Sequence, residues 1–224
     1  MKSEATMNTE LQILKSNPLF RGLEDKDIYF ALSAFSATQQ SYEKGEILVS
    51  AGGRMNRFGL VLSGIVSASF SDIDGNDILM ANVGAGETFG ESLCWLKIEE
   101  IPVSVAAVTD SVILWLDPHS VPDNDQNNIA FELSIRFASM LAQKTLSMNE
   151  RIQVLSKPTI RQKLLTFFAQ WSVKSGSKLF SVPYDRETLA LYLGVNRSAL
   201  SRELSLMQKE GIIEFYKNTF KILK

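Results

Sequence analysis

The chain has 224 residues, of which 45% are apolar and 21% are charged, and its formal net charge is −2. This composition suffices for one large or two modest globular domains, and it excludes a disordered chain or a collagen-like fibre. No apolar run approaches the roughly 18 residues that a membrane-spanning helix needs, and the first ten residues are polar where a secretory signal would be apolar. We therefore expect a cytoplasmic protein with no membrane partner.

The charge is distributed unevenly along the chain. Residues 157–224 hold 12 Lys and Arg against 5 Asp and Glu, a net charge of +7, whereas residues 1–156 have a net charge of −9. A basic module joined to an acidic body is the electrostatic pattern of a nucleic-acid reader attached to a second function. Chance segregation of surface charge would give the same numbers. The charge therefore does not distinguish a nucleic-acid-binding module from a chance distribution, and sequence motifs are needed for that.

Cys94 and His119 are the only cysteine and histidine in the sequence. One Cys cannot supply an internal disulfide or the four thiolates of an iron–sulfur cluster. We expect no metal site, because metal sites need several converging ligands, and for the same reason no haem and no cupin-type metalloenzyme. Cys94 lies among apolar neighbours, which favours a buried structural thiol over a redox sensor, and His119 is expected to be an ordinary surface or loop residue. The sequence offers no catalytic residues, so we expect a protein that is not an enzyme.

In the first half of the chain, the pattern of apolar residues changes near residue 40 from helical spacing to short strand-like runs. Apolar residues at helical spacing predict short helices over residues 9–16 and 25–36. From Gln40 to Asp117 the pattern changes to short apolar or alternating runs separated by glycines, which is typical of an antiparallel barrel or roll. Asp74-Gly75 lies between two such runs and predicts a hairpin, because both residues tolerate positive φ. The aromatic residues of this region are either core or the lining of a pocket for an apolar or aromatic ligand: Phe89, Trp95 and Trp115.

Residues 127–156 contain no Gly or Pro and predict the longest helix of the chain. A helix of this length would span ~45 Å, which is more than the width of a small domain. Two apolar stripes run along it, the first made of Leu133, Phe137, Met140 or Leu141, Met148, Ile152 and Leu155, the second of Ile135, Ala138, Ala142 and Leu146. We expect one stripe to pack on the roll and the other to meet a second copy in a parallel two-helix seam; a single core helix is the alternative.

The C-terminal part predicts a helix-turn-helix. After Lys157-Pro158, interpreted as a hinge, residues 159–174 predict a helix. Asp185 is a suitable N-cap for a further helix that ends at Gly194, and Asn196 can cap a second one from Arg197 to about Lys209. The face between these two helices is formed by Leu189, Leu193, Val195, Leu200 and Leu204. Residues 212–216 and 220–223 predict two strands about a polar turn, which form a wing.

The second helix of such a motif presents its N-terminal end to the major groove of DNA. We expect the DNA-contacting residues to be Asn196, Arg197, Ser198, Ser201 and Arg202 on this helix and Lys217 in the wing. Arginine can bond guanine bidentately, serine can bond bases or phosphates, and Lys217 with Lys221 is expected near the phosphates. Glu203 either accepts from a cytosine amino group or lies on the solvated side of the helix, which is the favoured interpretation.

The chain as a whole resembles the Crp/Fnr family of regulators. Residues 195–204 and 209–213 resemble the recognition helix and wing of that family, and residues 45–48, 64–66, 74–75 and 86–91 resemble its cyclic-nucleotide-type β-roll. The resemblance runs from about Phe20 to the end of the chain. It implies an α+β fold with an N-terminal antiparallel, jelly-roll-like β-roll in residues 1–126, a dimerisation helix in residues 127–156 and a winged helix-turn-helix in residues 157–224. It also implies a homodimer that binds palindromic double-stranded DNA, contacts RNA polymerase and responds to a small effector.

The same resemblance implies an effector site at the turn before residue 94, formed by Phe89, Gly90, Glu91, Ser92 and Leu93. In members that bind cyclic AMP, an Arg-Ser pair downstream helps to hold the cyclic phosphate. The matching positions here are Ile101 and Pro102, which cannot neutralise or hydrogen-bond a phosphate. We therefore expect an unknown effector other than cyclic AMP, whose countercharge would have to come from Arg54, Arg57, Lys97, Arg136 or Lys144. The alternative is a constitutive DNA-binding regulator whose roll is vestigial and binds nothing.

Overall fold

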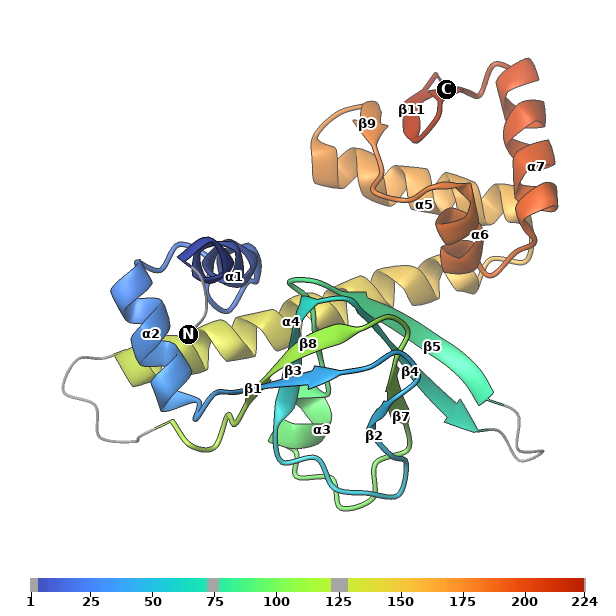
Figure 1. Cartoon of the computed structure of the whole chain (residues 1–224). Coiled ribbons are helices and arrows are strands. Elements are labelled where there is room, and N and C mark those ends of the chain that lie inside the picture. Colours follow the sequence, from blue (N-terminus) through green and yellow to red (C-terminus); the bar gives the residue numbers. More distant parts are fainter. Residues whose placement is uncertain (1–3, 72–76, 122–128, 224) are drawn as a thin grey trace. The chain divides into compact units, whose positions relative to one another are not determined.

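The computed structural model describes residues 4–71, 77–121 and 129–223. The chain divides into two compact units, Met1–Leu141 and Ala142–Lys224, and the division falls inside helix α4 (Ile129–Leu155). Figure 1 shows the elements of both units. Among the described residues, no helix has both the length and the apolar character needed to cross a bilayer.

The first unit contains a β-roll of two four-stranded antiparallel sheets, as the sequence predicts. One sheet has the strand order β1-β8-β3-β6, formed by Thr38–Tyr42, Ser111–Leu116, Phe58–Ser63 and Thr88–Phe89. The other has the order β2-β7-β4-β5, formed by Ile47–Val49, Ser104–Ala107, Ile65–Ser71 and Asp77–Gly84. Strands β1 and β2 therefore end the two sheets at one edge of the roll, and β6 and β5 end them at the other.

Strands β4 and β5 form the predicted hairpin. Their register runs from Ile65 opposite Gly84 to Ser71 opposite Asp77. The turn residues Asp74 and Gly75 lie outside the described residues.

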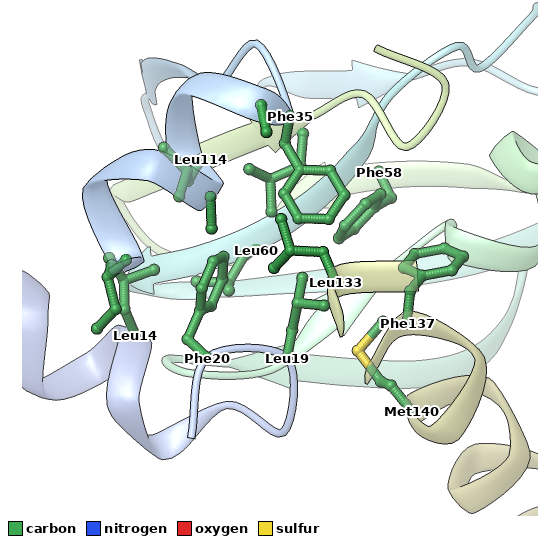
Figure 2. Packing of buried hydrophobic residues seen from close by; sticks show 14 of the residues in the cluster. Leu14, Leu19, Phe20, Phe35, Phe58, Leu60, Leu114, Leu133, Phe137 and Met140 are labelled. Atoms are coloured by element: carbon green, nitrogen blue, oxygen red, sulfur yellow. The ribbon is translucent and has the colours of Figure 1, made fainter. Parts of the chain in front are cut away.

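Three helices cover one face of the β1-β8-β3-β6 sheet. Helices α1 (Glu4–Ser16) and α2 (Asp25–Ala34) confirm the two predicted helices, with α1 beginning five residues earlier than expected. Apolar residues from these helices and the segments that follow them, from the sheet and from the first half of α4 form one buried cluster (Figure 2). Because side chains alternate along a strand, Leu114 and Leu116 of β8 join this cluster, while Ile113 and Trp115 face the inside of the roll.

Helix α4 confirms the predicted long helix, but only half of its first stripe is buried. Leu133, Phe137 and Met140 pack in the cluster of Figure 2, whereas Met148 and Ile152 are exposed. The prediction that one stripe packs on the roll is confirmed for Leu133, Phe137 and Met140, and in the second half of the helix the buried residue is Val154, in the core of the second unit.

The second unit is a winged helix-turn-helix. Its elements in chain order are α5 (Ile160–Ser175), β9 (Leu179–Ser181), α6 (Arg186–Leu193), α7 (Arg197–Lys209), β10 (Ile213–Tyr216) and β11 (Thr219–Ile222). The strands form a sheet in the order β10-β11-β9. Strand β9 was not predicted, because three residues are too few to show an alternating pattern, and it exists by pairing with β11.

Candidate nucleic-acid interface and effector site

Local capping interactions fix the two helices of the motif. Asp185 accepts a hydrogen bond from the backbone N–H of Thr188 at 2.7 Å and so caps α6. Gly194 ends α6 with φ +61°, the left-handed conformation that glycine adopts without strain. Asn196 then caps α7 by accepting from the backbone N–H of Ser198 at 2.9 Å. All three predicted capping residues are confirmed.

The face between the two helices is also as predicted. Leu189 and Leu193 of α6 and Leu200 and Leu204 of α7 are buried in one core cluster, and Val195 of the turn packs against it. This packing leaves the opposite side of α7 to solvent.

The predicted DNA-contacting residues of α7 lie together on that exposed side: Asn196, Arg197, Ser198, Ser201 and Arg202 are all exposed. The hydroxyl of Ser198 donates to Asn196 Oδ1 at 2.6 Å, and the hydroxyl of Ser201 donates to the carbonyl oxygen of Arg197 at 3.0 Å. Both hydroxyls are therefore oriented by the helix. Arg202 forms no ion pair or hydrogen bond with any other described residue, and it borders a shallow hollow of about 420 Å³ on α7.

Glu203 is not on the solvated side, and the favoured interpretation of it is wrong. Its Oε1 accepts from Arg161 Nε of α5 at 2.6 Å. The same guanidinium donates from Nη1 and Nη2 to the two carboxylate oxygens of Glu210 at 2.7 and 2.9 Å. One arginine of α5 thus binds α7 at its middle and at its C-terminal end.

The wing is anchored to the first helix of the motif. Strands β10 and β11 meet at a turn in which Lys217 is exposed and has φ +52°. Arg186 of α6 donates to the carbonyl oxygen of Lys217 at 2.9 Å, and its guanidinium lies over the ring of Phe215 at 4.9 Å from the centroid. Asn218 donates to the carbonyl oxygen of Val182 at 2.8 Å. The position of Lys217 relative to α6 is therefore fixed by side-chain contacts that the sequence alone does not reveal.

In the first unit, the predicted effector turn is filled with apolar side chains. Gly90 begins the short helix α3 (Glu91–Trp95) with φ +80°, and a Cβ at Gly90 would clash with the side chain of Met55. Phe89 and Glu91 are buried, Leu93 is half-buried and Ser92 is exposed. The five residues predicted as an effector site lie on one turn, but Met55 packs against it from the inside of the roll.

Apolar side chains lie around this turn. Ile101 is only 1% exposed and belongs to the inner apolar cluster together with Met55 and Phe89. Burying a phosphate among these side chains would leave its charge uncompensated, which costs several kcal/mol. Arg136 is paired with Glu132 at 2.8 Å. Arg54 and Arg57 line a hollow next to β1 and β2, and Arg54 also borders a second hollow together with Cys94 and Lys97.

Cys94 and His119 lie where the sequence predicts. Cys94 is buried, and burial raises the pKa of its thiol to about 12. His119 is exposed, stacks on Trp95 with ring centroids 5.3 Å apart, and places its Nε2 3.3 Å from the carbonyl oxygen of Cys94. Trp95 is itself exposed, so of the three aromatic residues considered it is the one that belongs to neither the core nor the inside of the roll.

Comparisons with known proteins agree with this architecture. The model of the cyclic nucleotide-binding domain matches residues 39–123, and that of the Crp-like helix-turn-helix domain matches residues 162–224. The chain is 26% identical over 211 residues to the cyclic AMP receptor protein of Thermus thermophilus, covering 93% of this chain and 94% of the relative. It is 21% identical over 183 residues to the transcriptional activator FnrL of Cereibacter sphaeroides, covering 78% and 71% of the two chains. The fold also resembles the c-di-GMP responsive regulator CLP of Xanthomonas campestris, with a TM-score of 0.57 at 15% identity over 90% and 100% of the two chains.

A β-roll, a long helix and a winged helix-turn-helix with an exposed basic helix define a DNA-binding transcription regulator. The two domain matches occur in the same order as the β-roll and the winged helix-turn-helix, and the relative FnrL is a transcriptional activator. The chain belongs to the Crp/Fnr family.

Proposed function

We propose that the protein binds a specific DNA sequence by inserting the N-terminal end of α7 into the major groove. The observation that carries this proposal is the exposed set Arg197, Ser198, Ser201 and Arg202, which lies on one side of a helix whose other side is held in the core. Arg202 is free to bond the O6 and N7 atoms of guanine. We expect the ammonium of Lys217, in the wing, to approach phosphates, which would add affinity without sequence preference.

The proposed active form is a homodimer paired along α4. Phe131, Ile135, Ala138, Ala142 and Ile152 are exposed and lie at positions of a heptad seam, with two polar residues at the seam positions between Ala142 and Ile152. An exposed apolar stripe of this length marks an association surface. A second copy of the helix in parallel would cover it, and two copies of α7 would then read half-sites about 34 Å apart in a palindromic site. RNA polymerase is the further partner that transcription regulation requires.

We further propose that a small effector other than cyclic AMP binds the roll and shifts the dimer between conformations with different DNA affinity. An effector can change that affinity only by as much as it prefers one conformation. The second candidate is a constitutive regulator, and the packing of Met55 against Gly90 favours it, because that contact fills the predicted effector turn.

The test is the DNA affinity of the full-length protein. A binding site is first selected from random double-stranded DNA, and affinity is then measured by fluorescence anisotropy for the selected and for a scrambled duplex. We expect at least a thousandfold preference for the selected site; equal affinity for both would contradict the proposal. Tightening with a metabolite extract but not with cyclic AMP would establish a working roll, whereas equal affinity in all conditions would favour the constitutive regulator.

A further inference from the structure

The roll has a hollow at its β1/β2 edge that the predicted effector turn does not include. Its volume is about 540 Å³, and its lining includes Tyr42, Arg54, Arg57 and Trp115. The effector turn follows β6, which ends the same sheet at the opposite edge. Met55 lies between the two places, because it lines the hollow and also packs against Gly90 of the turn.

An aromatic wall of the hollow is held in place from two sides. Trp115 donates from Nε1 to the hydroxyl oxygen of Tyr42 at 3.1 Å. Its ring also meets the ring of Phe89 edge to face, with centroids 5.5 Å apart. A half-buried indole fixed in this way offers a flat apolar surface to a planar ligand at little conformational cost.

Tyr42 supplies a buried donor. The residue is 7% exposed, and its hydroxyl accepts from Trp115, but no described residue accepts the hydroxyl proton in a hydrogen bond. Burial raises the pKa of Tyr42 above its ordinary value, so the hydroxyl remains protonated at neutral pH and keeps its donor. Because Tyr42 lines the hollow, its hydroxyl proton is available to an acceptor atom of a ligand.

Two guanidinium groups supply positive charge at the same place. Arg57 donates from Nη1 to the hydroxyl of Thr38 at 2.9 Å, a neutral acceptor, and no carboxylate of the described residues pairs with it. Arg54 pairs with Glu99 at 3.0 Å, but the two side chains are 67% and 79% exposed, so this pair is weak and easily exchanged. The planar fork of arginine suits a carboxylate or a phosphate group.

We propose that this hollow binds a small organic anion with a planar ring, its acidic group on Arg57 and Arg54, its ring on Trp115 and one of its acceptor atoms on the Tyr42 hydroxyl. Its volume falls within the range of about 300 to 1,000 Å³ that small-molecule sites occupy. The identification of this anion as the effector rests on the proposed function. The existence of the binding site does not depend on DNA binding.

The experiment is a tryptophan-fluorescence titration of the full-length protein without DNA. Phenyl phosphate and benzoate combine a ring with an acidic group, whereas inorganic phosphate and benzyl alcohol each carry one part only. We expect at least one ring-bearing anion to give a saturable change and each separate part to bind at least tenfold more weakly. Tighter binding of phenyl phosphate would identify the ligand class as a phosphate ester, and tighter binding of benzoate would identify it as a carboxylate. The signal should be lost in Trp115→Phe, which leaves Trp95 and Trp171 as internal references.

Three further variants isolate the contacts. Arg57→Gln should weaken the ring-bearing anion at least tenfold, and Tyr42→Phe, which removes only the hydroxyl, should weaken it severalfold. Lys44→Gln removes the same charge from an exposed position outside the hollow and should leave binding unchanged. Absence of saturation by both ring-bearing anions at about 10 mM, a concentration well above a millimolar Kd, or equal affinity in Arg57→Gln, would overturn the proposal. DNA affinity measured in the same preparations separates this outcome from failure of the proposed function.

Discussion

Arg161 on α5 and Glu203 on α7 are joined by a hydrogen-bonded ion pair of 2.6 Å between Nε and Oε1. The same arginine holds Glu210 through its two terminal nitrogens. Glu203 follows Arg202 directly, so the contact lies next to a residue proposed to reach the bases. Arg161 is therefore a positioning residue for the recognition helix, because it acts on DNA through the placement of α7.

Replacing Arg161 by Gln should weaken specific DNA binding about tenfold, the size of losing one base contact, while non-specific binding changes little. Glu203→Gln should have a similar effect, and the double variant should cost less than the sum of the two, because the residues act as a pair. The double-mutant cycle is measured from the affinities of the wild type, the two single variants and the double variant for the selected and scrambled duplexes. Lys157→Gln removes the same charge from the segment before α5 and serves as the control; additive losses would refute the coupling.

Arg202 and Lys217 should differ in the kind of DNA binding they support. Arg202→Ala should weaken binding to the selected site by roughly 1 to 3 kcal/mol and relax the preference at one base pair. Lys217→Ala should weaken all sequences alike and reduce the slope of affinity against salt concentration by about one. Anisotropy titrations on a set of single-base variants of the site measure both effects. Equal losses on selected and scrambled DNA for Arg202→Ala would remove it from the base-reading set.

Ala142 lies at the centre of the exposed stripe of α4 and tests the proposed dimer. Ala142→Glu should place two like charges opposite each other in a parallel helix pair and shift the protein to monomers at micromolar concentration. Gln143→Glu, one residue further along, adds the same charge beside the seam and should leave the dimer intact. Sedimentation velocity measures the change. A dimer that persists in Ala142→Glu would place the interface elsewhere.

Cys94 should be unreactive in the folded protein. Burial, with a smaller contribution from the charge of Asp117, raises the pKa of its thiol from 9.0 to about 12. At pH 8 about one thiol in ten thousand is then ionised instead of about one in ten, so alkylation by iodoacetamide should be about 1,000-fold slower than in the unfolded chain. The rate should rise about tenfold per pH unit up to pH 12. Mass spectrometry of the alkylated protein over a pH series measures it, and equal rates in folded and guanidinium-unfolded protein would contradict the assignment.

The helix-turn-helix was predictable because its signals are local. Asp185 binds a backbone group three residues away and Asn196 binds one two residues away, so these local caps mark where α6 and α7 begin, and Gly194 marks where α6 ends. The alternation of Leu114 and Leu116 with Ile113 and Trp115 likewise indicates a strand with two different faces. These patterns depend on the intrinsic preferences of neighbouring residues, which a sequence displays directly.

The contacts that complete the sites were not predictable, because they join distant residues. Arg161 and Glu203 are 42 positions apart, and Tyr42 and Trp115 are 73 apart. Arg54 and Arg57 were considered only as substitutes for a missing countercharge, and the fold brings both of them to the hollow that Tyr42 and Trp115 line. A polar side chain on an exposed-looking face gives no sign of a partner that only the tertiary fold supplies.

The burial of Val154 limits where the DNA-binding unit can be joined to another protein. This residue of the last turn of α4 is fully buried in the core of the second unit, together with Leu164 and Leu193. A chain that started at Lys157 would lose it and leave a void lined by leucine side chains. The winged helix therefore cannot be exchanged between proteins at Lys157-Pro158 without loss of a core residue. A gene fusion that preserves its folding has to include the last turn of α4.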